Sequence, residues 1–125
     1  MLWVGQILSL SGMVKKLKEI LDDVEYPIIV EGKRDVDAIN EYGVEEVVSL
    51  KGRPLFKVAL SVSKNADKAL VLVDFDEEGE KIAKKLNTFL ERFGVVPKNS
   101  IRGKIKHILT LEGISQIENI PGPQE

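Results

Sequence analysis

The sequence predicts a single α/β domain with a mainly parallel central sheet flanked by helices. Short apolar runs, typical of buried strands, occur at residues 27–30 and 69–73, and the segment 45–50 with its two valines is also predicted to be a strand. Segments with apolar side chains at helical spacing separate these runs, and such alternation indicates parallel βαβ units. With 125 residues, 43% of them hydrophobic, the chain is long enough for one domain with a core and short for two.

The N-terminal part is expected to form a helix that packs on the sheet. Between residues 13 and 24 the apolar side chains share one stripe, with lysines and a glutamate on the other side. Ser11 is the expected N-cap of this helix. Trp3, further upstream, is expected to be a packing residue.

Two strands and two helices are expected between residues 27 and 62. The run 27–30 is rich in β-branched residues and stops at Glu31-Gly32, which indicates a strand. The helix predicted at 36–42 ends at Gly43, and a second strand follows at 45–50. The next helix begins at Pro54, since proline is favoured in a first turn. Its inner side carries Leu55, Val58, Ala59 and Val62.

The second half is organised around a central strand at 69–73. A helix is expected after Gly79, where apolar residues recur at helical spacing, and Gly94 ends it. Residues 95–100 are expected to be a connection. A further strand is predicted at 104–110, with the basic residues of 102–107 on one face, which is more simply a solvated face than a nucleic-acid strip. His107 is expected to be structural or at the surface.

These elements divide the chain into three parts. Residues 1–24 form an N-terminal helical segment packing on the domain, and residues 25–110 form the domain itself. Residues 111–125 form a C-terminal tail, expected to be irregular because it contains Pro-Gly-Pro. The sequence contains no internal repeats and no low-complexity tracts.

The composition of the chain excludes several kinds of site and segment. The absence of cysteine excludes disulfides and thiolate metal sites and favours the cytoplasm. We expect neither a bilayer-spanning segment nor a signal peptide, because long apolar runs and a basic leader are missing. A net charge of −2 does not indicate a nucleic-acid binder, but the charge is uneven and acids at a metal site can mask a basic groove. Basic residues precede the central carboxylates at Lys51, Arg53, Lys57, Lys64 and Lys68.

Carboxylates follow two of the predicted strands at the point where each strand ends. Glu31 follows the strand at 27–30, and Asp74 and Asp76 follow the strand at 69–73. Because parallel strands end at one rim, Glu31 is expected to face the two aspartates. Oxygen ligands suit Mg²⁺ or Mn²⁺, and a cation would relieve the repulsion among three acids.

The neighbouring residues suit a phosphate group. Gly32 and Gly79 are predicted to allow sharp turns and close approach of a ligand, and helix N-termini at these turns add positive partial charge. Lys33 and Arg34 are candidate phosphate contacts, although ordinary exposed charges explain them equally well.

Other motifs explain the aspartate pair less well. An EF-hand loop needs a bidentate glutamate where Lys85 stands, and an aspartyl phosphatase needs a threonine where Glu78 stands. Gly32-Lys33 lacks the earlier glycine and the hydroxyl residue of a P-loop. The plain alternative is that these acids are solvated strand ends and helix caps, which requires two separate strand ends to carry the pattern by accident.

Two segments, Glu31-Gly32-Lys33-Arg34-Asp35 and Asp74-Phe75-Asp76-Glu77-Glu78-Gly79, resemble the signature of the Toprim domain. That signature is a Glu-Gly turn after one strand and Asp-x-Asp-x-x-Gly after a later one, and the likeness covers roughly residues 25–110. Toprim domains occur in topoisomerases, bacterial-type primases, recombination-repair proteins and ribosomal-RNA maturation nucleases. The resemblance implies a Toprim-like, Rossmann-like fold in a near-minimal stand-alone chain.

The resemblance also implies roles. Glu31 would be the general acid or base with a share in the metal, Asp74 and Asp76 would hold Mg²⁺, and Asp35 would support them from behind. Tyr26 and Tyr42 are expected to pack, so the tyrosine nucleophile of topoisomerases has no counterpart. The implied activity is nuclease-like, on RNA or DNA. The alternative is a non-catalytic nucleic-acid or partner-binding module, and a homo-oligomer or a protein partner stays open.

Overall fold

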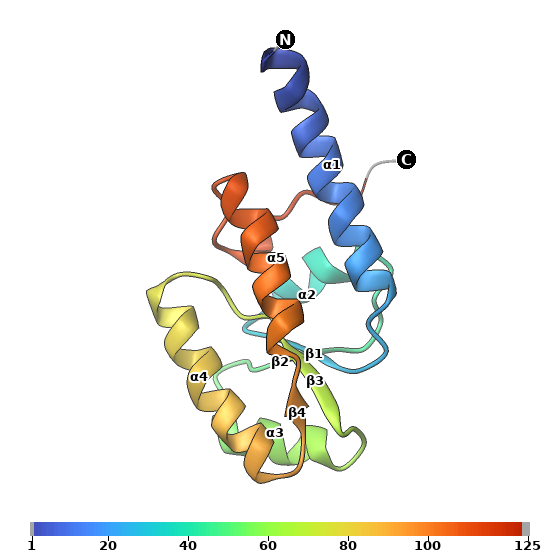
Figure 1. The fold of residues 1–125 in the computed structure, drawn as a ribbon. Coiled ribbons are helices and arrows are strands. Elements are labelled where there is room, and N and C mark those ends of the chain that lie inside the picture. The colour runs from blue at the N-terminus through green and yellow to red at the C-terminus, as the bar shows by residue number, and fades with distance from the viewer. Residues whose placement is uncertain (1, 124–125) are drawn as a thin grey trace.

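A computed structural model describes the backbone of residues 2–123 and the side chains of residues 11–123 (Figure 1). Helices and strands alternate along the chain. In order they are α1 (Leu2–Asp22), β1 (Ile28–Val30), α2 (Lys33–Asn40), β2 (Val47–Ser49), α3 (Leu55–Ser63), β3 (Lys68–Val71), α4 (Glu77–Arg92), β4 (Val96–Pro97), α5 (Asn99–Leu111) and a 3-10 turn, η1 (Ile117–Asn119).

The strands form one parallel sheet in the order β2-β1-β3-β4. Residue Ile28 is in register with Val47 on one side and with Leu70 on the other. The chain leaves β1 toward β2 and then crosses back to β3, so the strand order reverses between β1 and β3. Ligands of open α/β sheets bind at the carboxyl ends of strands flanking such a reversal. The predicted α/β fold with a parallel sheet is confirmed.

Side chains alternate between the two faces of the sheet and build two cores. One face packs against α1, α2 and α5, and the other against α3 and α4 (Figure 1). The residues of the first face include Ile28, Val30, Leu70 and Leu72. The residues of the second face include Ile29, Ala69, Val71 and Val73. Because both faces are covered, the strands are mostly apolar, and the polar residues in them are Ser49 of β2 and Lys68 of β3.

The strand predicted at 104–110 is wrong, because this segment lies inside α5. Its apolar side chains recur at helical spacing and pack into the first core: Ile101, Ile105, Ile108 and Leu109. The alternation of basic and apolar residues is a short local coincidence within this longer period. His107 is exposed on α5.

The connection predicted at 95–100 contains β4 and the start of α5. Only Val96 and Pro97 pair with β3, opposite Lys68 and Ala69. A proline cannot donate to a strand ladder, and it is tolerated here at the edge of the sheet. So short a strand gives no periodicity by which a sequence could reveal it.

Both ends of the chain are more ordered than expected. Helix α1 begins at Leu2, so Ser11 lies within the helix and is not its N-cap. The role predicted for Trp3 concerns a side chain outside the described ones. In the tail, predicted to be irregular, η1 forms and Ile117 and Ile120 are buried in the first core. No helix within residues 2–123 is both long and apolar enough to cross a membrane.

Candidate active site

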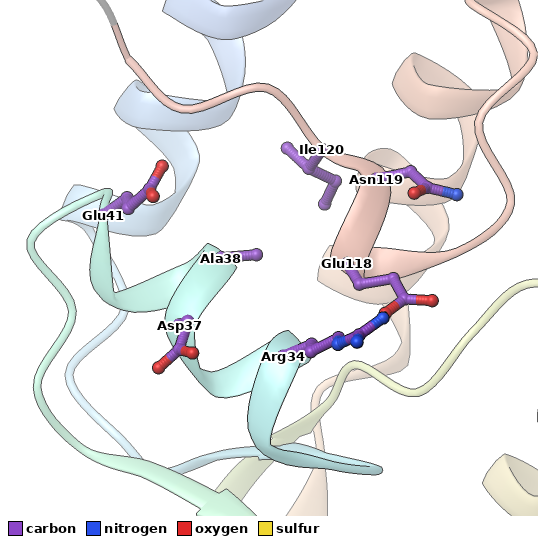
Figure 2. A pocket seen from close by; sticks show the side chains of 7 residues that line it. All are labelled: Arg34, Asp37, Ala38, Glu41, Glu118, Asn119 and Ile120. Carbon is purple, nitrogen blue, oxygen red and sulfur yellow. The ribbon is translucent and has the colours of Figure 1, made fainter.

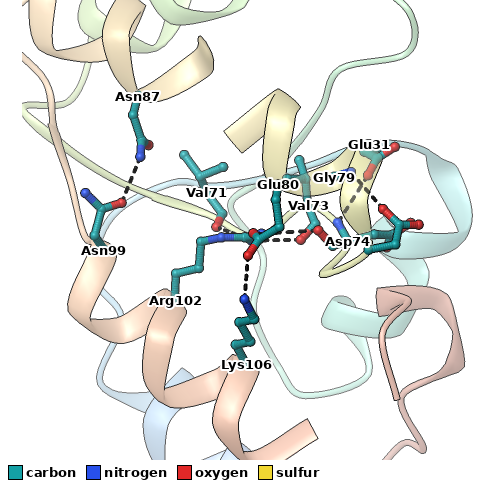
Figure 3. A network of polar contacts seen from close by, with 11 residues as sticks. Glu31, Val71, Val73, Asp74, Gly79, Glu80, Asn87, Asn99, Arg102 and Lys106 are labelled. Atoms are coloured by element: carbon teal, nitrogen blue, oxygen red, sulfur yellow. Dashed lines mark hydrogen bonds and ion pairs between the residues drawn. The ribbon is translucent and has the colours of Figure 1, made fainter. Parts of the chain in front are cut away.

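Glu31 joins the ends of the two central strands. It follows β1, and its Oε1 accepts a hydrogen bond of 3.1 Å from the backbone N–H of Asp74, which lies just beyond β3 (Figure 3). The two residues are 43 positions apart in the sequence. The contact lies where the strand order reverses, so the structure brings together the strand ends that the sequence predicted to meet.

Asp74 is held from the other side by the tail. Its Oδ1 accepts a hydrogen bond of 2.9 Å from the N–H of Ile117. The next residue, Phe75, donates its N–H to the carbonyl of Ser115 at 2.7 Å. The residues after α5 therefore lie against the aspartate turn, and Asp74 itself remains only half-buried.

Asp76 is the N-cap of α4. Its Oδ1 accepts a hydrogen bond of 2.7 Å from the N–H of Gly79, which satisfies one of the free donors at the start of the helix. A Cβ at position 79 would lie 2.0 Å from the carbonyl oxygen of Asp74. Glycine is therefore required here for the first turn of α4 to approach the Asp74 backbone, whether or not a ligand is bound.

Asp35 supports the start of α2. Its side chain is buried, and Oδ2 accepts a hydrogen bond of 3.1 Å from the N–H of Gly32. Gly32 has φ −144° and ψ −175°, an extended conformation open to any residue, and nothing lies within 4 Å of a Cβ built there. The turn expected at Gly32 therefore does not depend on a backbone conformation that only glycine adopts. The glycine leaves open space beside Glu31.

Lys33 and Arg34 are the first two residues of α2. Both are exposed, and an Arg34 guanidinium nitrogen lies 3.8 Å from a carboxylate oxygen of Glu118. Figure 2 shows Arg34 at a cavity of about 370 Å³ between α2 and η1. Its other lining residues are Asp37, Ala38, Glu41, Glu118, Asn119 and Ile120. Within the described residues, neither Lys33 nor Arg34 forms a hydrogen bond or an ion pair with Glu31, Asp74 or Asp76.

The acids of the rim perturb one another. Burial raises the pKa of Glu31, and the charges of Asp74, Asp35 and Asp76 raise it further, against the hydrogen bond from the Asp74 N–H. Burial likewise raises the pKa of Asp74, with added repulsion from Asp76 and Glu118. The pKa of Asp35 is raised by burial and then by Asp74 and Glu118. Perturbed pKa values of this kind are typical of functional sites.

Glu118 is an acid of this rim that the sequence did not reveal. It lies in η1, and its charge acts on both Asp35 and Asp74. Nothing in the local sequence marks it, because its neighbours across the rim come from α2 and from the end of β3. Only the fold of the tail brings it there.

The donor chemistry of the rim suits a hard divalent cation. Glu31, Asp74 and Asp76 offer carboxylate oxygens, and within the described residues the second oxygen of each accepts no protein hydrogen bond. The first oxygens are bound to backbone N–H groups, and no three acidic or histidine side chains of the described chain form a ready-made cluster for a metal. The three residues therefore have the right type of ligand atom for the cation, and each has one carboxylate oxygen free to bind it.

Arg102 fixes the end of β3 from α5, a role that sequence analysis missed. The residue is 7% exposed, and its guanidinium donates to the carbonyls of Val71 at 3.2 Å, Val73 at 2.8 Å and Asp74 at 3.1 Å (Figure 3). Pairing with β4 ends after Ala69, so these carbonyls have no neighbouring strand. The guanidinium takes the place of the missing strand and lies 4.4 Å from the centre of the Phe75 ring.

Glu80 holds this arginine in place. Its carboxylate accepts from Arg102 and, at 2.6 Å, from Lys106 one turn further along α5. Although burial alone would raise the pKa of Glu80, the hydrogen bonds from Lys106 and Arg102 lower it below the ordinary value. The helical period of α5 is the signal that could have placed Arg102 on the buried face with Ile105 and Leu109.

Comparisons with known proteins agree with this geometry. The model of the Toprim domain matches residues 27–112. A UPF0292 protein of Thermococcus sibiricus is 36% identical over 112 residues, covering 86% of this chain and 87% of that protein. A UPF0292 protein of Methanocaldococcus jannaschii is 34% identical over 113 residues, covering 85% and 88%.

A solved structure is also similar. A protein from Aquifex aeolicus superposes with a TM-score of 0.70 at 29% sequence identity, covering 88% of this chain and 96% of that one. Toprim domains in general bind magnesium and act on nucleic acids. With its α/β fold, its two acidic strand ends and a family match over most of its length, the chain belongs to the Toprim family, among the small UPF0292 proteins.

Proposed function

We propose that this protein is a magnesium-dependent, nuclease-like enzyme acting on nucleic-acid phosphodiesters. Glu31 serves as the general acid or base, and Asp74 and Asp76 hold the metal, with a share from Glu31. The observation that carries the proposal is the hydrogen bond between Glu31 and the Asp74 N–H, which joins the two strand ends at the reversal of the sheet. Family membership supports the chemistry.

Glu31 is suited to move a proton. Its pKa is raised by burial and by three neighbouring acids, so its protonated form persists closer to neutral pH than that of a free glutamate. One oxygen is occupied by the Asp74 N–H, which orients the side chain, and the other is available to a reacting group. A general acid or base must be held in this way to meet a substrate oxygen.

Asp74 and Asp76 would supply the ligands of Mg²⁺, for which Mn²⁺ is the expected substitute. When bound, the cation would neutralise charge that develops on the phosphoryl group. Asp35 would support them by holding the first turn of α2 and by adding negative charge behind Glu31.

The phosphate itself would lie beside Gly32, at the N-terminus of α2. The space beside this glycine is open, and helix N-termini favour anions. Lys33 and Arg34 are the cations closest in sequence, and the pair between Arg34 and Glu118 is exposed and weak enough to exchange for a phosphate. Gly79 would let the start of α4 approach from the other side.

Cleavage assays test the proposal. Purified protein is incubated with structured RNA and DNA in Mg²⁺ or Mn²⁺, and Glu31→Gln, Asp74→Asn and Asp76→Asn are compared with it. We expect cleavage, and a loss on the order of 10²- to 10⁴-fold for Glu31→Gln. Asp37→Asn, an exposed acid on α2, is the matched control and should retain activity. Cleavage unchanged in all three site variants would refute the assigned roles.

A second candidate is a non-catalytic module that binds nucleic acid or a protein partner, as a monomer or homo-oligomer. The observation that favours it is that Glu31, Asp74 and Asp76 are each bound to a backbone N–H and form no ready-made metal cluster within the described chain. Tight binding of nucleic acid with no turnover in any metal would favour this candidate over the enzyme.

A further inference from the structure

We propose that a single strand of nucleic acid leaves the rim over the 51–53 loop and along α3, held there by lysines and by the exposed ring of Phe56. This inference rests on the proposed function, because it takes the phosphodiester at the rim to belong to that strand. It adds a second contact surface and a substrate class.

The first observation is a local reversal of charge. The chain carries a net charge of −2, yet between residues 47 and 73 the only acid is Asp67. The cations of the same stretch are Lys51, Arg53, Lys57, Lys64 and Lys68. Within the described residues none of the four lysines makes an ion pair with an acid. Phosphates along a nucleic-acid backbone are the natural counterions of such a strip.

The second observation is that this strip begins at the rim. The Lys51 N–H donates to the carbonyl of Glu31 at 3.0 Å, and the Ser49 hydroxyl donates to the same carbonyl at 3.2 Å. Lys51 and Gly52 both have positive φ, 47° and 71°, so the loop turns tightly there before α3 begins. The lysine that opens the strip is therefore tied to the proposed general acid or base.

The third observation is an exposed apolar stripe among these cations. Phe56 is 45% exposed and Leu60, one turn further along α3, is 41% exposed. The Phe56 ring leans on Phe89 of α4, with ring centroids 6.3 Å apart, and Arg92 lies 5.7 Å from the centre of the Phe89 ring. Phe56 is thus held in place with much of its ring open, as in the platforms on which unpaired bases stack.

Cations and an aromatic ring together distinguish the strand from other ligands. A duplex would bind the cations through its phosphates, but its bases are stacked inside it and are not free to stack on Phe56. A single strand can bind the cations through its phosphates and stack a base on the ring. An acidic protein segment would use the cations in the same way, and the experiment separates it. Figure 1 places α3 and α4 together on the face of the sheet opposite α1. Lysines of α1 therefore lie away from the proposed surface and can serve as the control.

The experiment measures binding of a fluorescent single-stranded oligonucleotide, as RNA and as DNA, by anisotropy in EDTA over a series of salt concentrations. The test variant is Lys57→Gln with Lys64→Gln, and the matched control is Lys15→Gln with Lys16→Gln, exposed lysines of α1. We expect the slope of log K against log salt to become shallower by about 1.4 in the test variant, two contacts at about 0.7 each, and to stay unchanged in the control. Equal slopes in both variants would overturn the proposal.

Phe56→Leu tests the substrate class. It keeps an apolar side chain and removes the ring, so we expect roughly tenfold weaker binding of the single strand and no change for a duplex of the same sequence. Equal effects on single strand and duplex would overturn the assignment. Nucleic-acid binding that no α3 variant alters would also overturn it, and would leave an acidic protein as the partner of this face.

The outcome is separable from that of the proposed function. Because binding is measured without divalent metal, a wild-type protein that never cleaves can still show the α3 dependence, which would refute the nuclease and leave this surface standing. Conversely, cleavage that is lost in Asp74→Asn while the lysine variants bind normally would refute the surface alone. Melting temperatures of all variants confirm that each is folded.

Discussion

Position 79 accepts only glycine, because its backbone has no room for a Cβ atom. Because a Cβ there would lie 2.0 Å from the Asp74 carbonyl, Gly79→Ala must push the start of α4 away from the aspartate turn. We expect a loss of about 1–3 kcal/mol in the free energy of unfolding, measured by urea denaturation. Gly103→Ala is the matched control, since nothing lies within 4 Å of a Cβ there. In the middle of α5, that change should stabilise the protein by about 0.5–1 kcal/mol.

Charge at Asp74 opposes folding when no cation is present. Burial and neighbouring acids raise the pKa values of Asp74 and Glu31 in the folded state. The stability that their protonation contributes is fully present below the ordinary carboxyl pKa and is lost as the pH rises through the raised folded values. In EDTA at neutral pH, Asp74→Asn should therefore melt about 2 °C above wild type, a difference that vanishes in mild acid.

Magnesium should reverse that order. A cation bound to the folded protein alone raises its melting temperature by mass action, so wild type should gain with added Mg²⁺ and Asp74→Asn should not. Differential scanning calorimetry with and without Mg²⁺ provides the measurement. A variant that melts below wild type in EDTA, or that gains equally from Mg²⁺, would contradict this account of the site.

At the scale of elements, β3 is completed by a side chain. Arg102 donates to three backbone carbonyls that no strand reaches. Arg102→Met should leave these buried acceptors unsatisfied and cost about 2–3 kcal/mol of unfolding free energy in urea titrations. Lys106→Met removes the exposed partner of the same glutamate and should cost less than about 1 kcal/mol. Equal costs for the two substitutions would show that the arginine is an ordinary surface charge.

Helices and strands whose apolar residues recur regularly over many positions could be predicted from the sequence, and very short elements could not. Strands β1, β2 and β3 and the helices around them follow from apolar runs and helical spacing. The period of α5 was mistaken for alternation because a strand and a helix give similar patterns over seven residues. Glu31, Asp74 and Asp76 were predictable because they come just after the ends of predicted strands. Arg102 and Glu118 were not, since their roles depend on which segments pack together.

At the scale of the whole molecule, the tail closes the fold through Tyr42. Its hydroxyl donates to the carbonyl of Pro121 at 2.6 Å. Tyr42→Phe should cost about 1 kcal/mol at neutral pH, measured by thermal unfolding. Tyr26→Phe is the control, because the Tyr26 hydroxyl makes no hydrogen bond within residues 2–123.

Alkaline pH should remove the same contribution. Burial, with a further effect of Glu41, raises the pKa of Tyr42 to about 12 from an ordinary value of 10. The stability from this tyrosine is therefore fully present below about pH 10 and is lost as the pH rises through about 12. The gap between wild type and Tyr42→Phe should close over that window, and a constant gap would contradict it.

The two hydrogen bonds that hold Asp74 set the order in which the molecule can be completed. One partner, Glu31, lies 43 residues before it, and the other, Ile117, lies 43 residues after it. Closing each loop of that length costs about 3 kcal/mol of chain entropy, which only the finished core can offset. In a nascent chain whose residue 117 is still inside the ribosome, the Asp74 side chain therefore lacks its hydrogen bond from the Ile117 N–H. We therefore expect the acidic rim to be among the last parts of the protein to fold.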